Sequence, residues 1–124
     1  MRKIELFERA IEEKAANLND YGINSTAFWA YRKSIEAEND LINFYDVIWD
    51  NDIEPITETL KQNGITRFTI SSNFSGLLQT LAEFEKYGFR IECLTEVYTD
   101  YKDWQTGERT RIPAVQLKHI LETR

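Results

Sequence analysis

The sequence has very little of the side-chain chemistry from which most catalytic and metal sites are built. It contains one cysteine, Cys93, and one histidine, His119, among 124 residues. A single cysteine excludes an internal disulfide and a zinc site made of several cysteine ligands. Cys93 lies in an apolar stretch, where a free cysteine usually behaves as a small hydrophobe, so we expect it to be buried.

Long hydrophobic runs are also absent. No stretch approaches the roughly 20 apolar residues that a membrane-spanning helix needs. The N-terminal residues MRKIELFER mix charges of both signs and do not have the pattern of a secretory signal. We therefore expect a protein of the reducing cytoplasm that does not bind membranes.

Basic residues are outnumbered by acidic ones. The chain has 15 Lys and Arg against 21 Asp and Glu, a net charge of -6. This balance argues against direct binding to nucleic acid, whose phosphates need a basic surface. The acids gather in residues 36–54 (the acidic segment), which contain no Lys or Arg. Residues 102–124 differ in sign, with five Lys or Arg against three acids.

The composition is otherwise that of a folded domain. Hydrophobic residues make up 42% of the chain and aromatic residues 13%. This is enough to form a core in a single domain over residues 1–124 without disulfides. Apolar residues at helical spacing predict a helix over residues 2–19 and a second over 26–38. Together they predict an N-terminal helical hairpin in residues 1–40.

Residues 41–120 alternate between strand and helix patterns. The expected elements are a strand near 42–48, a helix capped by Asp50, Asn51 or Asp52 and ending at Gln62, a strand at 66–71, a helix at 77–87, a strand at 89–99, a loop at 99–110 and a last strand at 111–120.

This order predicts an α/β fold, with α+β as the alternative. The helical hairpin precedes a βαβαββ portion whose small sheet is mixed and mostly parallel, with helices packed on it. We expect the two strands of the unit at 66–99 to pair in parallel. The last strand should run antiparallel beside the third. The strand order stays open, as does whether the hairpin covers the sheet or swaps between chains.

The turn at residues 71–76 is the first candidate site. It follows a predicted parallel strand and precedes a helix, where open sheets bind ligands and helix N-termini favour anions. The candidate ligand-binding residues are Ser71, Ser72, Asn73, Ser75 and Gly76. The turn lacks the lysine of a P-loop and the spacing of a dinucleotide loop. The alternative is ordinary helix capping by Asn73 or Ser75.

The acidic segment is the second candidate. Asp46, Asp50, Asp52 and Glu54 could hold Mg²⁺ or Ca²⁺. Their spacing matches no calcium-binding loop, and acids at a helix start also stabilise the helix dipole. We favour that second role, and we expect no metal and no cofactor.

The third candidate is the loop near Trp104. It interleaves aromatic and basic side chains, which could stack on bases or bind a protein partner. The residues with which we expect an interaction are Tyr98, Tyr101, Trp104 and Arg109. The alternative is that Trp104 pins the loop to the core.

Catalysis by a nucleophile has little support. A Ser–His–Asp arrangement would require His119 to reach the serines of the 71–76 turn, and nothing in the spacing indicates this. We expect His119 to be a surface residue and name no catalytic residue.

Several segments together resemble a known family. They are DVIWD (46–50), FTISSNFSGLL (68–78), LAEFEKYG (81–88), LTEV (94–97), DWQTGER (103–109) and IPA (112–114). Over residues 41–118 the chain resembles a family of short uncharacterised proteins from Gram-positive gut bacteria, often carried on plasmids or conjugative elements. That family has no known activity. The resemblance implies a cytoplasmic accessory protein of mobile DNA.

We therefore expect a non-enzymatic protein that interacts with another protein through the acidic segment or the Trp104 loop. One alternative is a small-ligand or phosphate-binding domain, enzymes included, that uses the 71–76 turn. Another is a homodimer formed through the last strand or through the helix with Phe28 and Trp29.

Overall fold

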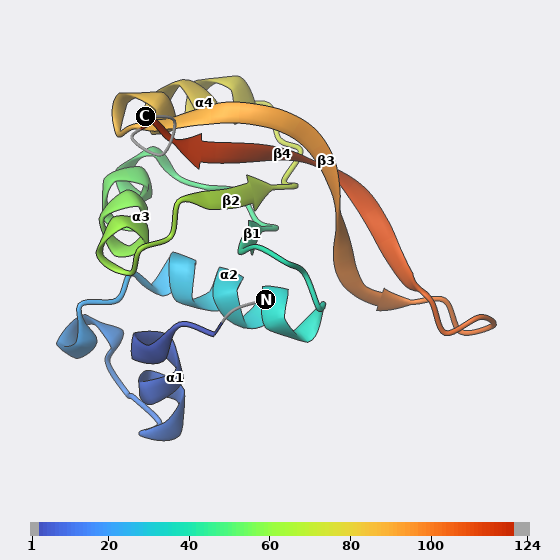
Figure 1. The fold of residues 1–124 in the computed structure, drawn as a ribbon, viewed down its shortest axis with the longest axis horizontal. Coiled ribbons are helices and arrows are strands. Elements are labelled where there is room, and N and C mark those ends of the chain that lie inside the picture. Colours follow the sequence, from blue (N-terminus) through green and yellow to red (C-terminus); the bar gives the residue numbers. More distant parts are fainter. Residues whose placement is uncertain (1–2, 121–124) are drawn as a thin grey trace.

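The computed structural model describes residues 3–120, apart from the side chain of Asp100 (Figure 1). The elements in chain order are α1 (Glu5–Glu12), the 3₁₀ helix η1 (Leu18–Tyr21), α2 (Ser25–Glu36), β1 (Asn43–Phe44), α3 (Asp50–Gln62), β2 (Arg67–Ile70), α4 (Leu77–Lys86), β3 (Phe89–Lys102) and β4 (Arg109–His119). The fold is α+β, with helices packed on a mixed sheet.

The sheet has the strand order β1-β2-β4-β3 in the described part of the chain. β1 pairs with β2 in parallel, and β4 pairs antiparallel with both β2 and β3. The prediction that the last strand lies antiparallel beside the third is therefore confirmed. The predicted parallel pairing within the unit at 66–99 is wrong, because β4 inserts between β2 and β3. Two of the three pairings are antiparallel, so the sheet is not mostly parallel.

The apolar residues of β4 explain its position between β2 and β3. Val115 lies opposite Ile70 and Leu117 lies opposite Phe68, so one face of β4 continues the apolar face of β2. Leu117, Ile70 and Phe68 are all buried. A strand that completes a buried face is favoured over an exposed edge by the hydrophobic effect.

Phe68 is the centre of the core. Its ring lies 5.4 Å from that of Phe44 on β1, 5.1 Å from Phe84 on α4 and 5.2 Å from Phe89 on β3. Aromatic pairs at these tilted or edge-on angles add to the stabilisation that burial provides. The same core includes Leu60 of α3, so α3 and α4 both pack on this face of the sheet.

The N-terminal helices pack beside this core. Phe7 of α1 is fully buried, with ring centroids 5.8 Å from Phe28 and 5.1 Å from Tyr31 of α2. α2 lies between α1 and the sheet (Figure 1). α1 is shorter than predicted because the chain turns at Lys14, whose φ of 50° is left-handed.

Several boundaries differ from the prediction. β1 has only two residues, since its partner β2 ends at Ile70 opposite Phe44. Half of the predicted loop at 99–110 is strand, because β3 extends to Lys102 and β4 begins at Arg109. Trp49, and not Asp50, Asn51 or Asp52, is the N-cap of α3, and it makes no side-chain capping bond.

Cys93 is exposed, so the prediction that it is buried is wrong. A bulge at Glu92 shifts the register, so that Ile91 pairs with Leu117 but Cys93 pairs with Gln116. Opposed residues share a face, and Cys93 is thereby placed on the face with Gln116, away from the buried Leu117.

Candidate interaction site

The β3–β4 hairpin continues beyond the rest of the sheet. β4 pairs with β2 only from Val115 to Lys118, whereas it pairs with β3 as far as Arg109 opposite Lys102. Residues 98–111 (the arm) therefore project from the remainder of the molecule (the body) as a two-stranded ribbon (Figure 1). Because an isolated two-stranded hairpin is only marginally stable in water, the base of the arm needs support.

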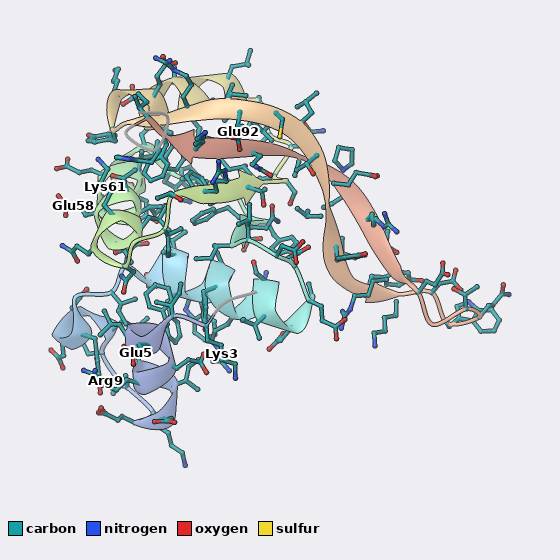
Figure 2. The ribbon with its side chains drawn as sticks, viewed as in Figure 1. Lys3, Glu5, Arg9, Glu58, Lys61 and Glu92 are labelled. Carbon is teal, nitrogen blue, oxygen red and sulfur yellow. The ribbon has the colours of Figure 1, made fainter. Side chains whose placement is uncertain are left out.

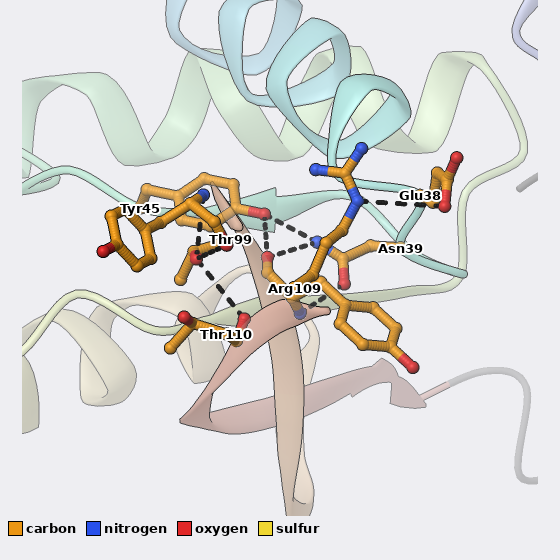
Figure 3. A network of polar contacts seen from close by, with 8 residues as sticks. Glu38, Asn39, Tyr45, Thr99, Arg109 and Thr110 are labelled. Carbon is orange, nitrogen blue, oxygen red and sulfur yellow. Dashed lines mark hydrogen bonds and ion pairs between the residues drawn. The ribbon is translucent and has the colours of Figure 1, made fainter. Parts of the chain in front are cut away.

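That support comes from Asn39, just after α2. Tyr98 donates its backbone N–H to Asn39 Oδ1 at 2.7 Å, and its carbonyl accepts from Asn39 Nδ2 at 3.0 Å (Figure 3). The carbonyl also accepts from the Tyr45 hydroxyl at 2.6 Å. The Asn39 amide thus pairs with Tyr98 as a neighbouring strand would. Asn39 is 4% exposed and Tyr98 is half-buried, so the clamp is partly shielded from water.

Charged side chains add to the base of the arm. Arg109 Nε lies 3.8 Å from Glu38 Oε2 (Figure 3), and the Arg111 guanidinium lies 5.3 Å from the centre of the Tyr98 ring. Glu38 has a φ of 62°, a left-handed conformation that favours glycine. Glu38 therefore places a carboxylate beside Arg109 in a backbone conformation that would be less strained for a glycine.

The tip of the arm is a fixed turn. Asp103 Oδ1 accepts the backbone N–H groups of Gln105 at 2.8 Å and Thr106 at 3.1 Å. The backbone of Asp103 bonds to that of Gly107 and Glu108, each at 2.7 Å. Such side-chain-to-backbone bonds hold a turn without burial.

This turn presents aromatic side chains to solvent. Trp104 is 83% exposed and Tyr101 is 63% exposed. The alternative that Trp104 pins its loop to the core is therefore wrong. Between Tyr98 and Lys102 the register with β4 shifts, and Thr99 Oγ1 accepts the N–H of Tyr101 at 3.2 Å and donates to the carbonyl of Thr110 at 3.3 Å. Bulges of this kind redirect side chains on a strand.

The turn at 71–76 is arranged differently from the sequence prediction. Ser71 Oγ accepts from the Asn43 side chain at 2.8 Å, and Ser72 is buried. Asn73 and Ser75 are exposed. Gly76 is the N-cap of α4, which makes no side-chain capping bond, so capping by Asn73 or Ser75 is wrong. Residues 71–76 contain no Lys or Arg, and the role of this turn as a ligand site stays a prediction.

His119 and the serines lie at opposite ends of β2. The backbone N–H of His119 donates to the carbonyl of Thr66, just before β2, while Ser71 follows the end of β2. Thr66 and Ser71 are five residues apart along an extended strand, which separates them by about 16 Å. A Ser–His pair is therefore excluded here. His119 is half-buried, with its ring 5.1 Å from the Phe89 ring, so it is less exposed than we expected.

The acids of the acidic segment point to separate partners. Asp46 pairs with Lys33 at 3.4 Å, and the Tyr87 hydroxyl donates to Glu54 at 3.4 Å. Asp52 accepts from Asn24 Nδ2 at 3.1 Å and, over a shorter distance, from the Thr26 hydroxyl. Among residues 3–120, no three His, Cys, Asp or Glu side chains form a group that could hold a metal ion. The acids of this segment instead link α2 and α4 to the region around α3.

The uncovered face of the sheet carries one well-paired carboxylate. Glu92 accepts from Arg67 Nε at 3.1 Å and Gln116 Nε2 at 2.7 Å, and lies 3.6 Å from Lys118 Nζ (Figure 2). These partners, the Arg67 hydrogen bond foremost, lower the pKa of Glu92 below its ordinary value. The carboxylate lies between two cations and a side-chain amide of neighbouring strands, which argues for a structural role.

A groove of about 610 Å³ lies beside α1 and the α3–β2 loop. Its charged lining residues have both signs: Lys3, Glu5, Arg9, Asp40 and Arg67. Figure 2 shows Lys3, Glu5 and Arg9 on the N-terminal part of the chain. Mixed charges of this kind do not select one class of ligand.

Burial raises the pKa of Tyr31 to about 12. Its hydroxyl donates to Glu8 Oε2 at 2.8 Å and accepts from the Ile4 N–H at 3.1 Å. Because the hydroxyl is fully bonded between α2 and the start of the chain, Tyr31 holds the N-terminal helices together.

Sequence reasoning missed Glu38, Asn39 and Tyr45, which position the arm. Asn39 and Tyr98 are 59 residues apart in the chain, so no local pattern links them. The one available signal was a polar residue that follows a helix and precedes a strand, a common feature of loops.

Residues 26–119 match the model of a family described as a domain of unknown function (DUF7698). The chain belongs to this family. The matched region contains the complete arm and the clamp residues Asn39 and Tyr45, but not α1 or η1. Comparison with curated proteins and with solved structures gives no significant match. Within residues 3–120, no helix has the length and apolar character needed to cross a membrane.

Proposed function

We propose that this chain is a non-enzymatic protein-interaction protein and that the arm is its contact element. The observation that carries the proposal is the exposure of Trp104 and Tyr101 on a ribbon that is clamped at its base. Trp, Tyr and Arg are the residues that most often dominate binding energy at protein interfaces.

The hydrogen bonds at the base and the tip of the arm support this proposal. The Asn39 clamp fixes the direction of the arm, and the Asp103 turn fixes its tip. A contact element that is ordered before binding loses less conformational entropy when it docks. Exposed aromatic side chains on such a preformed element can bind a partner, whereas they add little to the stability of the isolated chain.

The acidic segment is the weaker candidate for the contact. Its carboxylates Asp46, Asp52 and Glu54 already interact with side chains of the same chain. A partner would have to replace these interactions, whereas Trp104 has its surface open to solvent. A role as an accessory protein of mobile DNA rests on the sequence resemblance alone and stays a prediction.

The test is a pull-down from a lysate of the source cells with three purified baits. They are the wild type, the arm variant with Trp104→Ala and Tyr101→Ala, and the control variant Trp49→Ala, whose tryptophan is 70% exposed on the body. We expect recovery of the partner to fall at least about tenfold for the arm variant and to be unchanged for the control. Equal recovery by all three baits would refute the proposal. All three should have the same thermal stability within about 0.5 kcal/mol, since the altered side chains are exposed.

A further inference from the structure

A second groove lies at the N-terminal end of the body. It has a volume of about 600 Å³ and is formed by the end of α1, the segment before η1 and the first turns of α2. Its lining includes the buried Ala10 and Phe28, together with Ile11, Leu18 and the half-exposed Trp29. We call it the N-terminal groove. It has the apolar floor and aromatic rim that would suit an aromatic side chain.

The charges that line this groove have one sign. Lys14 and Arg32 are its cations, and the described residues that line it include no acid. The Arg32 guanidinium lies 5.3 Å from the centre of the Trp29 ring, so it extends over the aromatic rim. In a chain of net charge -6, a groove with only cations selects an acidic ligand.

The tip of the arm has the complementary properties. Residues 103–108 contain two acids, Asp103 and Glu108, and no Lys or Arg, and they present the exposed Trp104. The cations that flank this segment are Lys102 and Arg109, and Arg109 already pairs with Glu38 of the body. The exposed ring of Trp104, near Asp103 and Glu108 in the turn, therefore fits an apolar groove lined by Lys14 and Arg32. Burial of an aromatic side chain removes about 150–250 Å² from water, which is a large contribution for one residue.

The groove and the tip lie on opposite sides of one molecule. The arm projects to the right of the body in Figure 1, while α1 and η1 lie at the lower left. A tip therefore cannot enter the groove of its own chain. From the complementary charge and shape we infer that the occupant of the N-terminal groove is the Trp104 tip of a second copy. This inference rests on the proposed function of the arm and names its partner.

Each copy carries one tip and one groove, so two copies can exchange tips across a two-fold axis. Such a dimer has two equal contacts, and formation of the first makes the second intramolecular. If the rotation does not close, the same contact builds longer chains, and the assembly then grows with protein concentration.

The test measures self-association of the full chain by sedimentation velocity over a range of concentrations. The tip variant is Trp104→Ala. The two groove variants are Ala16→Glu, at an exposed lining residue, and Arg32→Glu. Trp49→Ala is the control. We expect the wild type and the control to associate, and each tip or groove variant alone to dissociate at least about tenfold more readily. Circular dichroism verifies that each variant is folded.

A mixture of variants gives the sharper result. The tip variant still has an intact groove, and the groove variant still has an intact tip. Their mixture should therefore form a heterodimer with one contact, and it should do so more readily than either variant associates by itself. The inference would be overturned if the mixture formed no heterodimer, or if neither the tip variant nor the groove variants weakened the association.

The inference and the proposed function can fail separately. A wild type that stays monomeric while recovery of a cellular partner still depends on Trp104 overturns the self-association and leaves the arm as a contact element. If Trp104 affects neither association nor recovery, both are wrong.

Discussion

The body of this molecule packs a cluster of phenylalanine rings in its core, whereas the arm exposes Trp104 and Tyr101. Phe44, Phe68, Phe84 and Phe89 are at most 2% exposed, while Trp104 is 83% exposed. The body is held by apolar contacts between helices and sheet, and the arm is held by hydrogen bonds from Asn39 and within its own turn. The same residue class therefore stabilises the fold in one region and is available for binding in the other.

The largest expected loss of stability comes from the substitution Phe68→Ala in the body. Removal of a fully buried ring should reduce the free energy of unfolding by about 3–5 kcal/mol, because it leaves a cavity among three other rings. Urea denaturation measures this loss. The matched control is Leu94→Ala at a side chain that is 81% exposed, which should change stability by less than about 0.5 kcal/mol. Similar losses for both variants would contradict the assignment of Phe68 to the core.

A second test measures how the stability of the body depends on pH. The pKa of Tyr31 is raised from 10.0 to about 12 by burial, so the folded state retains this proton when the unfolded state has lost it. The stability due to Tyr31 is complete below pH 10 and should fall by about 2–3 kcal/mol as the pH rises from 10 to 12. Tyr31→Phe removes this titration, at a cost of about 1 kcal/mol at neutral pH for the lost hydrogen bonds. Equally steep alkaline unfolding of both proteins would exclude Tyr31 as the cause.

The smallest expected effect on stability belongs to the arm. Asn39→Ala removes both hydrogen bonds to Tyr98, and it should cost about 1 kcal/mol because water can replace the amide at the half-buried Tyr98. Hydrogen exchange at the Tyr98 N–H should become much faster, while exchange in β2 stays unchanged. The control is Asn73→Ala at an exposed asparagine of the 71–76 turn. Unchanged exchange at Tyr98 would show that the arm holds its direction without the clamp.

The sequence by itself determined the elements that local patterns encode. The predicted helices at 26–38 and 77–87 agree with α2 and α4 within two residues at each end. The helix predicted to follow a cap at Asp50, Asn51 or Asp52 ends at Gln62 as α3 does, and α3 begins one to three residues earlier than predicted. Their apolar residues recur at helical spacing, and this signal depends only on neighbours in the chain. The sequence also marked Tyr98, Tyr101, Trp104 and Arg109 as an unusual group. Their role in binding stays a prediction.

Only the tertiary structure decided the features that depend on distant residues. The position of β4 between β2 and β3 follows from the match of Val115 and Leu117 to the apolar face of β2. The exposure of Cys93 follows from a bulge in the pairing with β4, and the base of the arm is held by Asn39, which lies 59 residues from Tyr98 in the chain. Strand register and buried polar contacts are set by partners far away in the chain, so a local pattern cannot reveal them.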